Sequence, residues 1–149
     1  MKIEDEIKQK KFRSEYHKMI VNLFFTSNWA SAHQNKLLKP FGLSLQQFNI
    51  LRILRGQHPN PATLGLLQER MLDKNSNASR LVDKLKLKKL VERVECKSDR
   101  RQVDILITEK GLEQLKELDL LMDGGEKLFH SVTEQEAGEM NRILDKLRG

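Results

Sequence analysis

Short polar and basic side chains between positions 74 and 101 are the residues of this chain best suited to bind another molecule. Serine, asparagine, arginine and lysine side chains form hydrogen bonds with base edges and with phosphate oxygens. Five of them occur close together: Ser76, Asn77, Ser79, Arg80 and Lys84. If this segment is helical, its backbone N–H groups at the N-terminal end can also meet phosphate. Polar residues at a helix start are also ordinary caps, which is the alternative interpretation.

The positive charge of the chain gathers in the same segment. The whole chain has 27 lysines and arginines against 21 acidic residues, a net charge of +6. Residues 74–101 contain ten basic and four acidic side chains, so they carry the entire excess. Such a concentration favours a polyanionic partner such as nucleic acid, although a solvated charged surface is the alternative.

A second polar and basic stretch lies between two predicted strands. Leu90–Glu95 and Gln102–Thr108 are β-like, and in the second segment Val103, Ile105 and Ile107 alternate with Gln102, Asp104 and Leu106. The residues between the strands predict an exposed, charged hairpin tip. Its candidate contact residues are Lys97, Asp99, Arg100 and Arg101.

Three predicted helices precede the hairpin and position these side chains. Ser44 and Gln47 have capping-box spacing at the start of the first, which runs to about Arg55. Asn60 can cap the second, with Pro61 at its first position. The third spans about Ser76 to Lys89. It has one apolar face, formed by Ala78, Leu81, Val82 and Leu85.

Helices with large apolar faces flank this region. Residues 3–38 predict one long helix or two helices run together, and further helices follow from Thr108 and from Thr133. These faces are larger than one small domain needs, which predicts a homodimer, with internal packing as the alternative. They include Met19, Ile20, Leu23, Phe24, Ala30, Ala137, Met140, Leu144 and Leu147.

The order of elements predicts one domain over residues 1–149, mainly α with a small β-hairpin (α+β). Residues 43–108 form a winged helix-turn-helix, in which the hairpin is the wing, and residues 1–38 and 109–149 supply dimerisation helices. Two recognition helices about 34–36 Å apart would then read double-stranded DNA. A winged helix that binds protein or RNA is the alternative, and apolar anchors would then be expected in place of Asn77, Ser79 and Arg80.

Four short motifs resemble the multiple antibiotic resistance regulator (MarR) family, in the order that the family shows. They are Ser79-Arg80-Leu81-Val82-Asp83-Lys84-Leu85, Leu90-Val91-Glu92-Arg93, Asp99-Arg100-Arg101 and Leu106-Ile107-Thr108-Glu109-Lys110-Gly111. The resemblance, which runs from about Leu43 to Gly111, implies a sequence-specific transcriptional regulator, typically a ligand-responsive repressor.

Within that resemblance the wing residues acquire separate roles. Arg101 would enter the minor groove and Asp99 would orient it, while Arg100 and Lys97 would contact phosphate. Asp99 could equally be a plain turn residue. The sequence departs from the family where Lys88 or Lys89 replaces a glycine before the first wing strand. It departs again at Gly65, which suggests close packing in the helix before the turn.

Family members often bind small aromatic effectors, and Trp29 and His33 lie one helical turn apart where they could line such a pocket. They could equally be core and rim residues. Cys96 is the only cysteine, so no intramolecular disulfide forms, and we interpret it as a bystander thiol.

No catalytic motif, metal-ligand spacing or cofactor motif is recognisable, which predicts a non-enzymatic protein without cofactor or metal. The N-terminus lacks the apolar core of a secretory signal, and no apolar stretch approaches the roughly 18 residues of a membrane span. A cytoplasmic protein is therefore expected.

Overall fold

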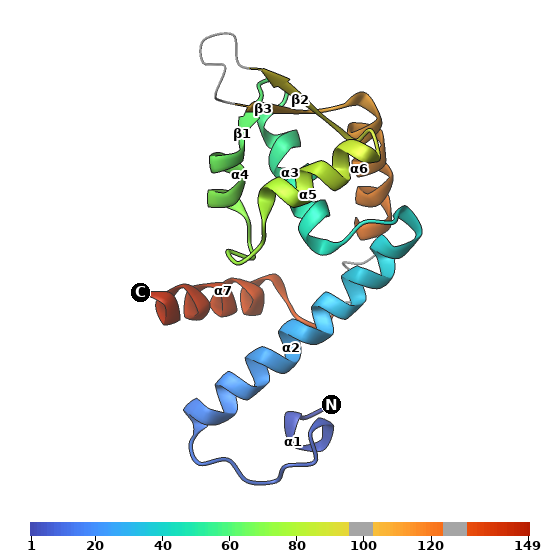
Figure 1. The fold of residues 1–149 in the computed structure, drawn as a ribbon. Helices are drawn as coiled ribbons and strands as arrows, with labels where there is room; N and C mark the ends of the chain where they lie inside the picture. The colour runs from blue at the N-terminus through green and yellow to red at the C-terminus, as the bar shows by residue number, and fades with distance from the viewer. Residues whose placement is uncertain (96–102, 124–130) are drawn as a thin grey trace.

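The computed structural model describes residues 1–149 except 96–102 and 124–130. The helices between Leu45 and Asp123 and the three strands form a lobe at one end of the molecule, while α2 (Glu15–Leu38) and α7 (Glu134–Arg148) lie side by side at an angle below it (Figure 1). The chain is mostly helical with one small antiparallel sheet. The predicted mainly α class with a winged helix-turn-helix is therefore confirmed.

Helix α3 (Leu45–Gln57) begins where the capping box predicts. The Ser44 hydroxyl accepts from the Gln47 backbone N–H at 3.2 Å, and the Gln47 side chain accepts from the Ser44 N–H at 3.0 Å. Both donors belong to the helix start, where no backbone partner is available. The predicted apolar side of α3 is buried, with Leu51 and Leu54 at 0% and 1% exposure.

The predicted helix start at Pro61 is wrong. Ala62 and Thr63 instead form a short strand, β1 (Ala62–Thr63), in which Ala62 pairs with Ile105. Helix α4 (Leu64–Arg70) follows, and the Thr63 hydroxyl caps it by accepting from the Leu66 N–H at 3.1 Å. Pairing with a strand more than forty residues away therefore prevails over the local Asn-Pro signal.

Helix α5 (Ala78–Leu87) begins two residues later than expected, because Asn77 and not Ser76 provides its cap. The Asn77 Oδ1 accepts from the Arg80 backbone N–H at 3.0 Å. Ala78, Val82 and Leu85 are buried beneath the helix, as its apolar periodicity predicts.

Two further strands complete the sheet, in the order β1-β3-β2. Strand β2 (Val91–Glu95) pairs antiparallel with β3 (Val103–Ile107), from Val91 opposite Ile107 to Glu95 opposite Val103. The predicted hairpin is confirmed, and the structure adds β1 on the other side of β3.

Gly111, in the first turn of α6 (Glu109–Asp123), lies against the start of the wing. A Cβ at this position would lie 2.4 Å from the Leu90 carbonyl oxygen and 2.7 Å from Cγ1 of Ile107. Thr108 holds the same corner, since its hydroxyl donates to the Lys89 carbonyl at 2.8 Å and accepts from the Gly111 N–H. The Leu-x-Thr-x-x-Gly motif is thus a packing requirement.

Gly65 has no such role, contrary to the expectation of close packing. It lies exposed in α4, and an added Cβ would meet only the Thr63 hydroxyl at an ordinary 3.7 Å.

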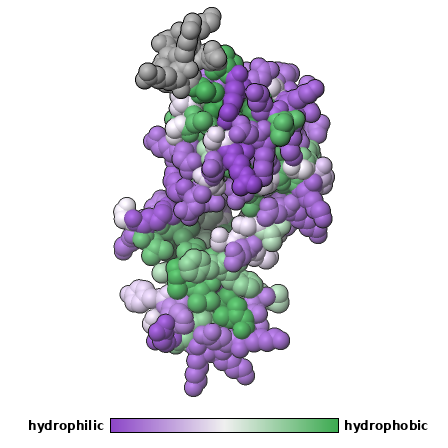
Figure 2. Space-filling model, viewed as in Figure 1, coloured by the Kyte–Doolittle hydropathy of each residue, from purple (hydrophilic) through white to green (hydrophobic). Residues whose placement is uncertain are grey.

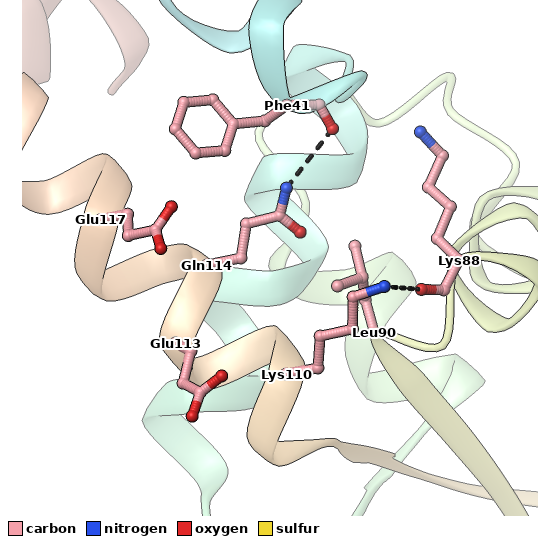
Figure 3. A pocket seen from close by; sticks show the side chains of 7 residues that line it. All are labelled: Phe41, Lys88, Leu90, Lys110, Glu113, Gln114 and Glu117. Atoms are coloured by element: carbon pink, nitrogen blue, oxygen red, sulfur yellow. Dashed lines mark hydrogen bonds between the residues drawn. The ribbon is translucent and has the colours of Figure 1, made fainter.

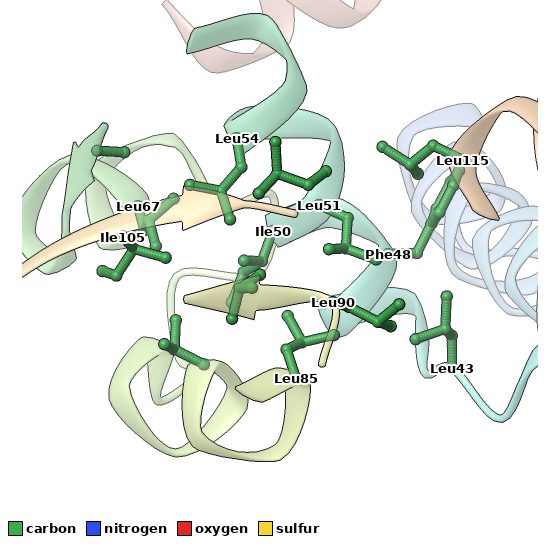
Figure 4. Packing of buried hydrophobic residues seen from close by; sticks show 14 of the residues in the cluster. Leu43, Phe48, Ile50, Leu51, Leu54, Leu67, Leu85, Leu90, Ile105 and Leu115 are labelled. Atoms are coloured by element: carbon green, nitrogen blue, oxygen red, sulfur yellow. The ribbon is translucent and has the colours of Figure 1, made fainter. Parts of the chain in front are cut away.

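One hydrophobic core joins the elements of the lobe (Figure 4). Ile50 from α3, Leu67 from α4, Leu85 from α5, Ile105 from β3 and Leu115 from α6 are all fully buried. Because α5 is anchored along its inner side, its opposite side must face outward.

The helices outside the lobe leave much apolar surface open. Residues 1–38 form a short helix, α1 (Ile3–Glu6), and a long one, α2 (Glu15–Leu38), separated by the non-helical residues 7–14. The prediction of one long helix, or of two helices run together, is therefore right only from Glu15 onward. A 3-10 turn, η1 (Lys39–Phe41), leads from α2 into the lobe. Helix α7 (Glu134–Arg148) has the predicted capping box of Thr133 and Glu136, yet none of its fifteen residues is buried.

Candidate nucleic-acid interface

The outward side of α5 presents a row of hydrogen-bonding and basic side chains. Asn77, Ser79, Arg80 and Lys84 are all exposed, as predicted. Ser76 is half-buried in the turn before the helix, so it is set back from this row. The Asn77 cap uses its carbonyl oxygen, which leaves the amide nitrogen as the donor that this side chain can offer a partner.

Gln68 fixes the turn that leads into α5. Its amide nitrogen donates to the Lys74 carbonyl at 3.1 Å, and its oxygen accepts from the Ala78 N–H at 3.2 Å. One α4 side chain thus joins both ends of the turn between the two helices. The sequence interpretation missed Gln68, because its partners are backbone atoms six and ten residues further along the chain.

The same turn carries a carboxylate that is kept ionised. The pKa of Asp73 is lowered, chiefly because its carboxylate accepts from the Asn75 backbone N–H at 3.0 Å. A hydrogen bond to the ionised form stabilises it. The turn geometry therefore favours charged Asp73 and persists well into mildly acidic solution.

The predicted wing contacts Lys97, Asp99, Arg100 and Arg101, together with Cys96, lie outside the described residues. The strand residues on either side of them are described. Glu95 ends β2, Val103 begins β3, and these two residues pair. The segment between them therefore starts and ends at adjacent positions at one end of the sheet.

Arg93 and Asp83 connect the wing strand to α5, and the sequence interpretation left both residues out of the site. The Arg93 guanidinium lies 3.0 Å from the Asp83 carboxylate. It also donates to the hydroxyl of Ser79 at 3.3 Å. Strand alternation was the available signal, since Arg93 is two residues after the buried Val91 and so shares its face of the sheet.

Between α5 and β2 the chain turns without the glycine that the resemblance leads one to expect. Lys89 takes the left-handed conformation with φ 59°, a region that costs a side-chain-bearing residue energy. Lys88 donates through its ammonium group to the Gly42 carbonyl, and the Lys110 ammonium donates to the Lys88 carbonyl at 3.1 Å. Contacts from both sides hold the turn in place.

A cavity of about 470 Å³ lies beside this turn (Figure 3). Figure 3 shows that two of its polar side chains form hydrogen bonds with the backbone of neighbouring segments. Gln114 donates to the Phe41 carbonyl at 3.3 Å, and Lys110 donates to the Lys88 carbonyl. Its remaining charged residues, Glu113 and Glu117, come from α6. We therefore regard this hollow as part of the scaffold of the wing.

Another cavity, also about 470 Å³, lies between α2, the start of α3 and the turn before α5. Trp29 and His33 do not line it, and Trp29 is 44% exposed. The α2 residues that do line it are smaller and polar: Ser27, Ser31 and Gln34. Across the cavity, Arg52 lies over the Phe48 ring, 5.8 Å from its centroid.

Apolar side chains of α2 and α7 remain exposed. Figure 2 shows hydrophobic residues gathered over the part of the molecule that these helices form, whereas the lobe above is mainly hydrophilic. The two helices also border an apolar hollow of about 400 Å³. The exposed large side chains include Met19, Ile20, Phe24, Met140, Ile143 and Leu147.

Within the described residues, no group of three or more histidine, cysteine or acidic side chains is arranged to hold a metal ion. None of the helices in that part of the chain combines the length and the apolar character that a membrane-spanning helix needs.

Comparison with known proteins supports the resemblance inferred from the motifs. Residues 41–102 match the profile of the MarR family. The transcriptional repressor MprA of Escherichia coli K12 is 33% identical over 86 residues, which are 58% of this chain and 49% of MprA. The chain thus spans about half the length of the curated relatives it matches.

Solved structures extend the likeness to nearly the whole chain. A MarR transcription factor from Planctomyces limnophilus is 28% identical, with a TM-score of 0.68 over 91% of this chain and 98% of that one. The organohalide-sensing regulator RdhR-CbdbA1625, solved in its 2,4-dichlorophenol-bound form, has a TM-score of 0.81 at 21% identity. That alignment covers 91% of this chain and 80% of the other, and at this identity it shows a shared fold.

Proposed function

Because residues 41–102 match the MarR family profile and the chain has a winged helix-turn-helix fold, we propose that it is a sequence-specific regulator that binds double-stranded DNA as a homodimer. The observation that carries the proposal is the exposed polar row at the N-terminal end of α5, with Arg93 of the wing strand paired to the same helix. An α-helix fits the major groove, where side chains such as Asn and Arg distinguish base pairs. We therefore term α5 the recognition helix.

Within this proposal, some side chains contact the edges of bases and others contact phosphates. Asn77, Ser79 and Arg80 read base edges, since they lie at the N-terminal end that enters the groove deepest. Lys84 contacts the phosphate backbone. The Ser76 hydroxyl is buried, so Ser76 contributes through the shape of the turn before the helix and not through a side-chain contact to DNA. In the wing, Arg101 enters the adjacent minor groove and Asp99 orients it, while Lys97 and Arg100 contact phosphate.

The apolar surface of α2 and α7 supports a homodimer. A monomer rarely exposes a contiguous apolar patch of this extent, and a second copy of the chain would cover it. Pairing also gives a physical advantage, because two recognition helices bind one helical turn of DNA apart, about 34 Å.

The cavity between α2 and the recognition region supports a small-molecule effector. A site of about 470 Å³ suits a compact aromatic molecule, and Arg52 beside Phe48 suits one with a negatively polarised oxygen. The dichlorophenol-bound relative supports the same class of ligand. Asp73 lines this cavity and belongs to the turn before the recognition helix, so a bound ligand would bear on that turn.

Selection of genomic DNA fragments with the purified protein tests the proposal, followed by gel shifts at several salt concentrations. Enrichment of fragments that share an inverted repeat, with affinity falling steeply as salt rises, is the expected result. Release of those fragments by added 2,4-dichlorophenol would support the effector site. Uniform binding to all fragments, or tighter binding to RNA, would contradict the proposal.

A further inference from the structure

Arg93 joins the wing strand to two successive turns of the recognition helix. Its Nη2 lies 3.0 Å from Oδ1 of Asp83, 3.3 Å from Oγ of Ser79 and 3.5 Å from the Ser79 carbonyl oxygen. Ser79 and Asp83 are four residues apart and therefore lie on one side of α5. A single planar guanidinium thus spans one turn of the helix that carries the proposed base contacts.

The position of Arg93 in the sheet explains this reach. Arg93 pairs with the buried Ile105, and side chains of paired residues lie on the same face of a sheet. Arg93 therefore starts on the face that covers the core, and only its end emerges beside α5. Its side chain is 26% exposed, which leaves the guanidinium less freedom than a surface arginine has.

We propose that Arg93 is a positioning residue for DNA recognition, which directs the Ser79 hydroxyl and holds the recognition helix in register with the wing. This inference rests on the proposed DNA-binding function. An arginine side chain can only donate hydrogen bonds, so the Ser79 oxygen must accept from it. The hydroxyl proton then points away from Arg93, and Ser79 approaches DNA as a donor. Its partner is a base acceptor such as guanine O6 or N7, adenine N7 or thymine O4.

The pairing also removes an electrostatic obstacle. Asp83 is 56% exposed, one turn after Ser79 on a helix that must approach phosphates. An uncompensated carboxylate there would repel the DNA backbone. With Arg93 at 3.0 Å from Asp83, the two charges largely cancel. Arg80 and Lys84 can then attract phosphates without repulsion from the Asp83 carboxylate.

The test compares Arg93→Met, Arg93→Lys and Ser79→Ala on the fragments that genomic selection enriches. Methionine keeps most of the side-chain length and removes every donor, whereas lysine keeps the charge and loses the planar fork. We expect Arg93→Met to lower affinity for the selected site about tenfold and to flatten preference at the base position that Ser79→Ala also flattens. Arg93→Lys should recover affinity but not that preference.

Two further measurements separate positioning from other roles. The slope of log affinity against log salt should stay at the wild-type value in the double variant Arg93→Met with Asp83→Asn, which keeps the net charge of the pair, whereas loss of a phosphate contact would reduce it by about one. In the double variant with Ser79→Ala, preference at the shared position should fall no further than in either single variant.

Several outcomes would overturn the inference. Unchanged affinity and preference in Arg93→Met would do so, and so would an equal loss on all sequences, with or without a fall in melting temperature. If the wild-type protein itself prefers no DNA sequence, both the proposed function and this inference fail. If wild type shows a preference that Arg93→Met retains, only the inference fails.

Discussion

In the proposed interface, some side chains determine which DNA sequence is bound and others only strengthen binding to any DNA. Arg80 is exposed on the first turn of the helix, and arginine in the major groove typically makes a bidentate contact to guanine. Lys97 belongs to the wing loop, where a lysine acts as a point charge toward phosphate. We expect Arg80→Ala to relax sequence preference at one position, by roughly 1–3 kcal/mol of discrimination.

Lys97→Ala is the matched comparison. It should weaken binding to all sequences alike and reduce the salt slope by about one. Competition gel shifts with single-base variants of the selected site measure both effects. Equal losses across sequences for both variants would refute this division of roles.

Gly111 has no side chain, and this allows α6 to pack directly against the start of the wing. Because a Cβ there would lie 2.4 Å from the Leu90 carbonyl oxygen, Gly111→Ala must displace backbone at the start of β2. We expect a loss of about 1–3 kcal/mol in the free energy of unfolding, measured by urea denaturation.

Gly56→Ala in α3 is the control for this variant, since nothing lies within 4 Å of an added Cβ there. Alanine favours the helix at that site by up to about 1 kcal/mol, so stability should rise. A Gly111→Ala protein as stable as the Gly56→Ala protein would show that the corner tolerates a side chain.

Lys89 occupies a left-handed turn that glycine enters more easily. Lys89→Gly removes that penalty, although glycine loses more freedom on folding, so a net gain of about 0.5–1 kcal/mol is expected. Urea denaturation checks the gain, with Lys86→Gly inside α5 as a control that should lose stability. A loss in both variants would mean that Lys89 contributes contacts that outweigh its strain.

At the scale of elements, Gln68 links helix α4 to the turn before α5 and to the first residue of α5. Gln68→Ala removes hydrogen bonds to the Lys74 carbonyl and from the Ala78 N–H, which should cost about 1–2 kcal/mol of stability. DNA affinity should fall as well, because the turn sets where the recognition helix starts.

Gln68→Glu provides the graded control. A glutamate keeps an acceptor for the Ala78 N–H but cannot donate to the Lys74 carbonyl, so we expect an intermediate loss. Thermal melts and gel shifts on the three proteins should rank them in that order. An alanine variant that binds DNA with wild-type affinity would show that the turn holds its shape without Gln68.

At the scale of the whole molecule, the exposed apolar side chains of α2 and α7 form the interface of the proposed homodimer. Charging α7 with Met140→Lys and Leu147→Lys should prevent a second copy from covering it, because burying two ammonium groups is costly. Light scattering after size exclusion should give the 17.4 kDa of one chain for this variant, whereas we expect twice that mass for the wild-type protein.

The charged variant should also lose operator binding, since one recognition helix alone contacts too few base pairs. Asn141→Lys adds charge to α7 at an exposed position that does not line the hollow, so it should leave mass and binding unchanged. A double variant that keeps the wild-type mass would place the dimer interface elsewhere.

Sequence alone determined the features that depend on neighbours within a few residues. The capping boxes at Ser44 and Thr133, the apolar side of α5 and the paired strands of the hairpin follow from short hydrogen bonds and periodic burial. The exposed row at Asn77, Ser79 and Arg80 followed from the same periodicity.

Tertiary structure decided everything that needs a distant partner. Strand β1 exists because Ala62 meets Ile105, and Arg93 belongs to the candidate site because the folded sheet brings it to Ser79 and Asp83. Strand alternation can place Arg93 on the core face of the sheet, but it does not identify Ser79 and Asp83 as its partners, since each contact becomes favourable only after packing has brought the two segments together.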